Sequence, residues 1–203
     1  MRARHVLVPL IVAGLALALI FWRGSGDAPI VDMSSDVSEC AANLARIYAG
    51  IALYHVREKH APTESGVRFL GALLASGALE DTAANRARLT CPGPGAEGVR
   101  KDVDYRNLEA LTGADSAYAG RDVAAFPLAK FPAGGSELEP LVACDNAHGL
   151  NHDGCMNVLY SDGSVVTLFL AEEIERGHLP AGTATIPLGQ DSPIPELRKL
   201  TAD

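Results

Sequence analysis

The sequence predicts an α+β protein in which an N-terminal transmembrane helix precedes a long amphipathic helix packed on a small antiparallel sheet. Three observations predict this class. An uncharged apolar run occupies residues 6–22, apolar residues recur at three- and four-residue intervals over residues 37–55, and two β-rich segments flank an Asp-Gly pair. The length of 203 residues suits one domain with appendages and excludes a TIM barrel or a two-domain dehydrogenase.

The apolar run predicts a membrane anchor. It follows Arg2 and Arg4 and precedes Arg23, and as a helix it is roughly 25 Å long, at the short end of what spans a hydrocarbon core of about 30 Å. The first 23 residues contain three Arg and no acidic residue, so the rest of the chain carries 14 basic against 25 acidic residues, a net charge of −11. The positive-inside rule therefore predicts a single-pass protein of the inner (cytoplasmic) membrane with a cytoplasmic N-terminus and a periplasmic, extracytoplasmic domain. A cleaved signal peptide is the alternative, and it places the domain in the same compartment.

The composition also limits the partners. A net charge of −8 and an aromatic content of 5% argue against a nucleic-acid partner. Proteins that bind nucleic acids use basic side chains to neutralise phosphates and aromatic side chains to stack on bases. The expected organisation is an anchor at 1–23, a flexible Gly/Pro connector at 24–33, an α+β domain at 34–176 and an extended C-terminal tail at 177–203.

Within the domain, a helix is expected from Ser34 or Ser35 to about Lys59, with Asp36 and Glu39 complementing the helix dipole in its first turn. Its apolar face consists of Val37, Cys40, Leu44, Ile47, Tyr48, Ile51 and Tyr54 or His55. The remaining predictions are a short helix at 66–76, a loop at 81–103, short strands at 103–108, 117–119 and 141–144, a hairpin of 156–160 and 165–170 around Ser161–Ser164, and a helical turn at 171–176.

The four cysteines fit an oxidising compartment, where an even number of thiols tends to pair. They lack Cys-x-x-Cys spacing, which gives no support to a zinc ribbon, a thioredoxin motif or a c-type haem site. Of the three connectivities we favour Cys40–Cys91 and Cys144–Cys155, since the second pair flanks a short loop. Free buried thiols are the alternative.

His152, a gap of nine residues and then Asp162-Gly163 form a recognisable pattern, together with Cys40-Ala-Ala-Asn, Cys91-Pro and the local run Asn157-Val-Leu-Tyr-Ser-Asp-Gly. The chain resembles a bacterial family of pilin-like, membrane-anchored proteins named for this motif. The resemblance covers roughly residues 36–170 and implies a pseudopilin-like fold, in which an N-terminal helix packs on an antiparallel sheet. The apolar segment lacks the usual prepilin cleavage motif and contains no acidic residue, which marks a divergent member.

The resemblance implies a structural or assembly role, in a type II secretion or type IV pilus-like system. Its partners would be the membrane through residues 6–22, envelope or secretion-apparatus proteins, or further copies of the chain. No enzyme is expected and no catalytic residue is assigned, because the sequence lacks a nucleophile elbow, a zincin motif and a phosphate-binding glycine loop.

The alternative function is an anchored metal-binding domain with binding or hydrolytic activity. Imidazoles and carboxylates gather near the hairpin and can hold calcium or zinc, although loop and turn geometry also accounts for residues of these types. The candidate metal ligands are Asp145, His148, His152, Asp153 and Asp162.

Overall fold

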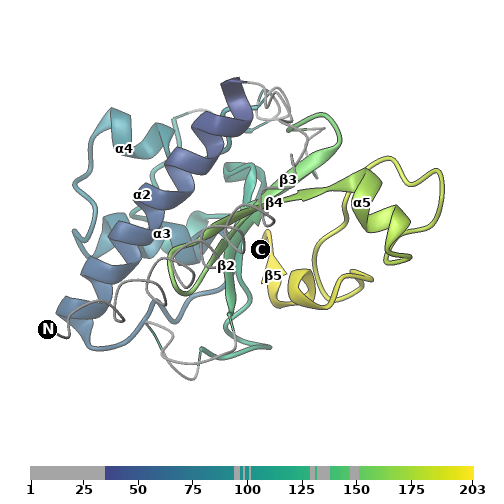
Figure 1. The fold of residues 1–203 in the computed structure, drawn as a ribbon. Helices are drawn as coiled ribbons and strands as arrows, with labels where there is room; N and C mark the ends of the chain where they lie inside the picture. The colour runs from purple at the N-terminus through teal and green to yellow at the C-terminus, as the bar shows by residue number, and fades with distance from the viewer. Residues whose placement is uncertain are drawn as a thin grey trace, which may run out of the picture. The chain divides into compact units, whose positions relative to one another are not determined.

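Five antiparallel strands form one sheet in the order β4-β3-β2-β1-β5 (Figure 1). The computed structural model describes residues 35–93, 97, 99–100, 102–128, 131, 138–146 and 151–203. The strands are β1 Tyr118–Arg121, β2 Pro140–Cys144, β3 Cys155–Tyr160, β4 Val165–Phe169 and β5 Leu200–Thr201. The three strands in the middle of the order are buried along their whole length, while β4 forms an edge and is partly exposed. The predicted α+β class with an antiparallel sheet is therefore confirmed.

The long helix α2, Ser35–Glu58, lies across the sheet and contacts β3 and β4 (Figure 1). Its apolar face follows the predicted spacing, because Leu44, Ile47 and Ile51 are fully buried. Asn157 of β3 donates a hydrogen bond of 2.9 Å to the carbonyl of Val37, which ties the start of the helix to the sheet. Each buried aliphatic side chain of this kind contributes about 1.5–3 kcal/mol to folding.

The second helix, α3, Val67–Ala75, packs against β1 on the same side of the sheet as α2 (Figure 1). Close packing is possible because β1 contains Gly120, where a Cβ atom would lie 2.2 Å from the carbonyl oxygen of Gly66. The strand and helix backbones thus approach more closely than any larger residue allows. The resulting core contains Phe69, Leu70 and Leu73, all fully buried.

Two predictions about local structure need correction. The expected loop at 81–103 contains a short helix, α4 Ala83–Ala87, which Thr82 caps by accepting a hydrogen bond from the backbone of Asn85. The expected strand at 103–108 is absent from the described residues there, and η2 Leu108–Ala110 begins at its end. The first difference is a local capping effect, because α4 contains no buried residue.

The C-terminal residues are also more ordered than an extended tail. After α5, Leu170–Glu175, the chain forms η4 Pro195–Lys199, and β5 then pairs with β1. Leu197 and Leu200 are fully buried. Residues 177–203 therefore complete the sheet and its core, a nonlocal pairing that sequence periodicity does not show.

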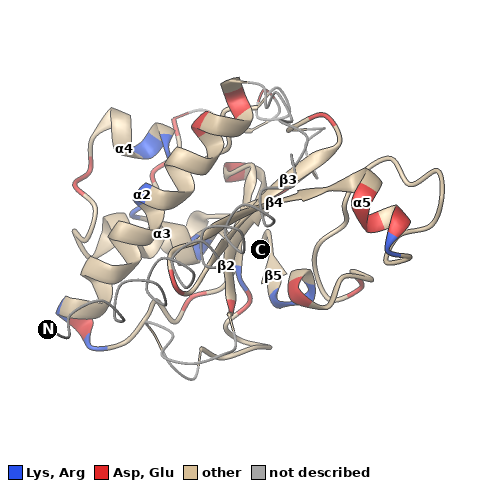
Figure 2. Cartoon of the chain, in the orientation of Figure 1, with Lys and Arg blue, Asp and Glu red and all other residues tan. Residues whose placement is uncertain are grey.

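Charged residues concentrate in the loops and helix ends, and β2 and β3 contain none (Figure 2). Within the described part of the chain, no helix has the length and apolar character needed to cross a membrane. The predicted anchor at 6–22 and connector at 24–33 lie outside the described residues.

Candidate metal centre

Three thiols and one imidazole meet in the interior beneath the start of α2. Their ligand atoms, the Sγ atoms of three cysteines and a ring nitrogen of one histidine, all lie within 4.8 Å of one another, and all four residues are buried. We call this group the thiol–imidazole cluster; it consists of Cys40, Cys91, Cys144 and His152.

Four separate segments supply these ligands. Cys40 projects from the second turn of α2, Cys144 is the last residue of β2, Cys91 lies in the loop after α4, and His152 precedes β3. Two strands and a helix position three of the ligands directly or through the adjoining residues. The cluster therefore joins parts of the chain that are far apart in sequence, such as the two cysteines at positions 40 and 144.

The distances inside the cluster suit a tetrahedral metal ion. The Sγ atom of Cys144 lies 3.2 Å from that of Cys40 and 4.0 Å from that of Cys91. Nε2 of His152 lies 3.2 Å from the Cys91 Sγ atom. A tetrahedral Zn²⁺ with Zn–S bonds of about 2.3 Å would hold its sulfurs roughly 3.8 Å apart. The observed sulfur separations bracket this value.

A glycine allows two of the ligand loops to approach each other. Gly93 follows Cys91 by two residues, and a Cβ atom there would lie 1.9 Å from the carbonyl oxygen of Asn151, next to His152. No side chain fits at such a separation. The side-chain amide of Asn151 in turn donates hydrogen bonds to the carbonyls of Ala117 and Asp145, which fixes this loop against β1 and β2.

Electrostatics explain why the cluster needs a cation for full ionisation. Burial raises the pKa of the Cys144 thiol well above its ordinary value, and hydrogen bonds with the neighbouring thiols raise it further. Hydrogen bonds from Cys144 and Cys91 instead lower the pKa of Cys40. Burial opposes a charge on His152, but hydrogen bonds with Cys40 and Cys91 raise its pKa to about 11. Three buried thiolates this close repel one another, so only a multivalent cation stabilises all three together.

Two further side chains contact the ligands from outside. The hydroxyl of Tyr118, which is fully buried, donates to the Sγ atom of Cys40 at 3.4 Å. Asp36 lies one helical turn before Cys40 and accepts a hydrogen bond of 2.9 Å from Nδ1 of His152. Sequence reasoning assigned Asp36 only to the helix dipole, because its contact with residue 152 spans 116 positions.

The predicted carboxylate ligands are not part of the cluster. Asp153 is exposed, and Asp162 accepts hydrogen bonds from the backbone and hydroxyl of Ser164 within the hairpin turn. Asp145 is buried beside Cys144, and its backbone NH donates to the carbonyl of Ala117. Of the five predicted ligands only His152 belongs to the cluster, and His148 lies outside the described residues.

The predicted disulfides are likewise absent from the structure. All four cysteines are free, and Cys144 lies next to Cys40 rather than bonded to Cys155. The 3.2 Å between the Sγ atoms of Cys40 and Cys144 is well above the disulfide bond length of about 2.05 Å. The short loop favours pairing Cys144 with Cys155. The sheet instead places Cys144, at the end of β2, next to Cys40 of α2. The sequence does contain three cysteines and a histidine, the donor types of a zinc site. They lack the short spacing that usually reveals such a site.

The two ends of the His152 and Asp162-Gly163 motif have different structural roles. His152 enters the cluster, while Gly163 adopts a positive φ of 89° in the turn between β3 and β4 and packs against the ring of Tyr48. The Tyr48 hydroxyl donates to the carbonyl of Ser161 at 3.4 Å. The two ends of the motif therefore contact two different turns of α2.

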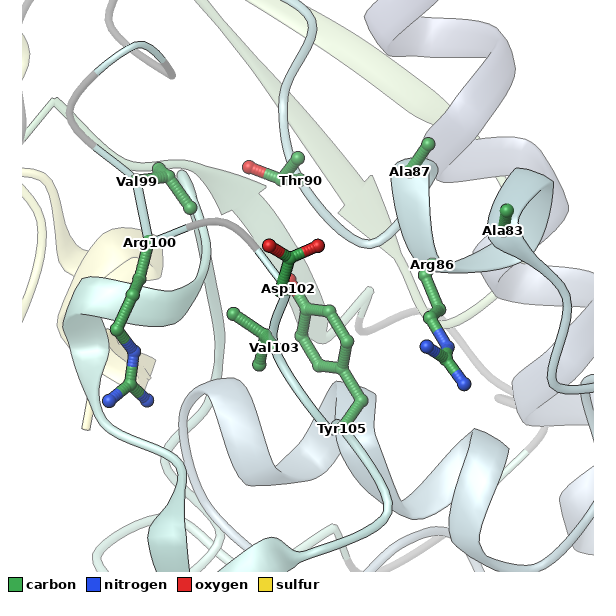
Figure 3. Close-up of a pocket in the computed structure, with 9 residues that line it drawn as sticks. All are labelled: Ala83, Arg86, Ala87, Thr90, Val99, Arg100, Asp102, Val103 and Tyr105. Carbon is green, nitrogen blue, oxygen red and sulfur yellow. The ribbon is translucent and has the colours of Figure 1, made fainter.

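A separate surface hollow of about 410 Å³ lies beside α4 (Figure 3). Three of the side chains that line it are engaged with protein partners. Arg86 pairs with Asp81 at 2.6 Å, Arg100 pairs with Asp115, and the Tyr105 hydroxyl donates to the backbone carbonyl of Asp115. The hollow therefore offers a weaker case for a functional site than the thiol–imidazole cluster.

No protein-family model matches this chain, and neither a curated protein nor a solved structure matches it. The donor atoms and geometry of the cluster are therefore what identify it as a candidate metal site.

Proposed function

We propose that the thiol–imidazole cluster is a structural Zn²⁺ site and that the chain is a structural, non-enzymatic module of the cell envelope. The observation that carries the proposal is the buried convergence of three sulfurs and one imidazole nitrogen within 4.8 Å. Thiolate and imidazole donors suit zinc, whereas calcium takes six to eight oxygen ligands. Of the two cations that the sequence allowed, the donor set favours zinc.

The closed ligand set favours a structural role over the hydrolytic alternative. Catalytic zinc sites have three protein ligands and leave the fourth position for water or substrate, while structural sites have four protein ligands. Here all four ligand residues are buried, which leaves a substrate little access to the ion. A cluster of this kind stabilises a fold without activating water.

Zinc binding is expected to contribute a large part of the free energy of folding. Zinc binding by structural sites in small peptides has an apparent free energy of about 10–16 kcal/mol, similar to the whole stability of a domain at about 5–15 kcal/mol. Because the cluster joins α2, the loop after α4 and the sheet, one ion would hold the three parts together.

The remaining features support a proposed location in the cell. The apolar run at 6–22 with its flanking arginines supports an inner-membrane anchor, and the net charge of −11 beyond it supports an extracytoplasmic domain. A long helix on an antiparallel sheet supports the pilin-like reading. We therefore place the chain in a type II secretion or type IV pilus-like assembly, with envelope proteins or further copies of itself as partners.

The zinc proposal is tested on the full chain, purified in mild detergent without a metal-binding tag. Metal analysis should find one zinc per chain, and X-ray absorption should give three sulfur and one nitrogen ligands. The variants Cys40→Ser, Cys91→Ser and Cys144→Ser should each lose bound zinc. Cys155→Ser is the matched control, since Cys155 is also buried but lies outside the cluster. Wild-type protein without zinc, or equal loss in the control, would overturn the proposal.

The assembly role has its own test. Cysteines introduced singly into residues 6–22 of the chain in its native membrane should give crosslinks to the same chain or to an envelope protein. A residue pattern of crosslinking with helical periodicity would support assembly through this segment. Complete absence of crosslinks at every position would exclude it.

A further inference from the structure

The carboxylate of Asp36 lies against the outer nitrogen of the cluster's histidine. Its Oδ2 atom is 2.9 Å from Nδ1 of His152, whose side chain is fully buried, while the Asp36 side chain is 29% exposed. The other ring nitrogen, Nε2, faces the Cys91 Sγ atom at 3.2 Å. One edge of the imidazole therefore faces the carboxylate and the other faces the cluster.

This arrangement selects one tautomer of the histidine. Zinc binds the neutral imidazole, and an ionised carboxylate accepts hydrogen bonds but donates none, so the one remaining ring hydrogen of a zinc-bound His152 is held on Nδ1. The lone pair then lies on Nε2, at the atom that faces the thiols. In metal sites, a carboxylate behind a ligating histidine fixes the ring orientation and increases its basicity.

Asp36 also lies on the helix that supplies a direct ligand. It precedes Cys40 by four residues, so both side chains lie on one face of the first two turns of α2. A metal ion would thus be held by α2 in two ways, through the Cys40 sulfur and through the ring that Asp36 orients.

We propose that Asp36 is the positioning residue of the metal centre, holding His152 in the Nε2-ligating tautomer so that the first turn of α2 becomes part of the zinc site. This inference depends on the proposed zinc function. By linkage, zinc binding stabilises the first turn of α2 as much as the formed turn strengthens zinc binding.

The competing explanation is general electrostatics, in which any negative charge near the helix start attracts a dication. Glu39 provides the matched control, because it is an exposed acidic residue in the same region of α2. Glu39→Gln removes the same charge without touching the histidine. Asp36→Asn removes the charge but leaves an oxygen that can accept from Nδ1, and Asp36→Ala removes both.

The experiment measures zinc affinity of the full chain by chelator competition, together with the visible spectrum of the Co²⁺-substituted protein. We expect Asp36→Ala to bind zinc 10- to 100-fold more weakly, the loss typical of outer-shell partners, and Asp36→Asn to lose less. Glu39→Gln should stay within about twofold of wild type, on the small scale of exposed charge effects. The Co²⁺ spectrum and the ¹⁵N shifts of His152 should change in the Asp36 variants alone.

The outcomes separate this proposal from the zinc proposal itself. If wild type binds no zinc, the proposed function fails. If wild type binds zinc and the Asp36 variants match Glu39→Gln in affinity and spectrum, only the positioning role fails. Equal losses in Asp36→Asn, Asp36→Ala and Glu39→Gln would assign the effect to charge and likewise overturn it. Thermal unfolding of the metal-free variants shows whether a loss of zinc affinity reflects misfolding. We expect their unfolding transition to match that of metal-free wild type.

Discussion

Replacing Gly93 by alanine should disrupt the proposed metal centre without mutating any of its four ligand residues. The added Cβ atom would lie 1.9 Å from the carbonyl oxygen of Asn151 and 2.7 Å from its carbonyl carbon. Contacts of a Cβ atom shorter than 3.0 Å are essentially never found, so the two loops must separate by about 1 Å. Cys91 lies on one of these loops and His152 on the other.

The size of the effect follows from the tolerance of metal geometry. Ligand distances vary by only about 0.2 Å in real sites, several times less than the forced displacement. One of the two ligands should therefore leave the ion. If about 10–16 kcal/mol is shared among four ligands, losing one costs about 2.5–4 kcal/mol, which weakens zinc binding by roughly 10²- to 10³-fold.

Chelator competition on the full chain measures this loss, and X-ray absorption counts the remaining ligands. Gly177→Ala is the control, since a Cβ atom at Gly177 has nothing within 4 Å, although the positive φ of 76° there makes the substitution cost backbone strain. That variant should lose about 1–2 kcal/mol of stability from backbone strain while keeping its zinc affinity. If Gly93→Ala binds zinc within a few-fold of wild type through four ligands, the argument from loop approach is wrong.

Three other perturbations follow from the same structure. At a free zinc concentration of about 1,000 times Kd, zinc should stabilise the fold by about 4 kcal/mol, so chelation should lower Tm by about 8–16 °C in a melting experiment. Oxidised glutathione should convert the Cys40 and Cys144 thiols of the zinc-free chain to a disulfide, releasing two reduced glutathiones. Bound zinc should prevent this oxidation, and peptide mapping detects the disulfide. Burial opposes ionisation of Glu139, but hydrogen bonds from Lys199 and Arg121 lower its pKa, so its stabilisation is complete above the ordinary value and is lost as the pH falls through the folded value. Glu139→Gln should therefore cost about 1–3 kcal/mol at neutral pH in denaturant titrations, with the difference from wild type shrinking below about pH 4.

The elements that the sequence predicted well are those specified by local pattern. The Asp162-Gly163 pair between two β-rich segments specifies the turn of β3 and β4, because Gly163 supplies the positive φ and Asp162 accepts hydrogen bonds within the turn. Apolar periodicity likewise specifies α2. Its buried face and its length depend on residues within a few turns of one another.

The site could not be predicted in the same way because its assembly is nonlocal. Cys144 reaches Cys40 only because β2 lies in the middle of the sheet and α2 crosses it, and neither fact can be read from spacing. The carboxylates near the hairpin are close together in sequence, so local spacing favours them as metal ligands over the widely separated cysteines. In the fold, Asp153 faces solvent and Asp162 accepts hydrogen bonds within the turn, so neither carboxylate lies in the thiol–imidazole cluster.

The nine-residue gap in the His–Asp-Gly pattern gains a physical meaning from this arrangement. The gap contains the whole of β3, so the strand places His152 near one end and Gly163 beyond the other. Between them, Asn157 binds the carbonyl of Val37, and at the far end the ring of Tyr48 packs on Gly163. Because side chains alternate along a strand, inserting one residue into β3 would turn one of these groups away from α2. The spacing is therefore a strand length that lets β3 and its flanking residues contact α2 near its start and again near its middle, and the thiol–imidazole cluster forms where the first of these contacts meets two cysteine-bearing segments.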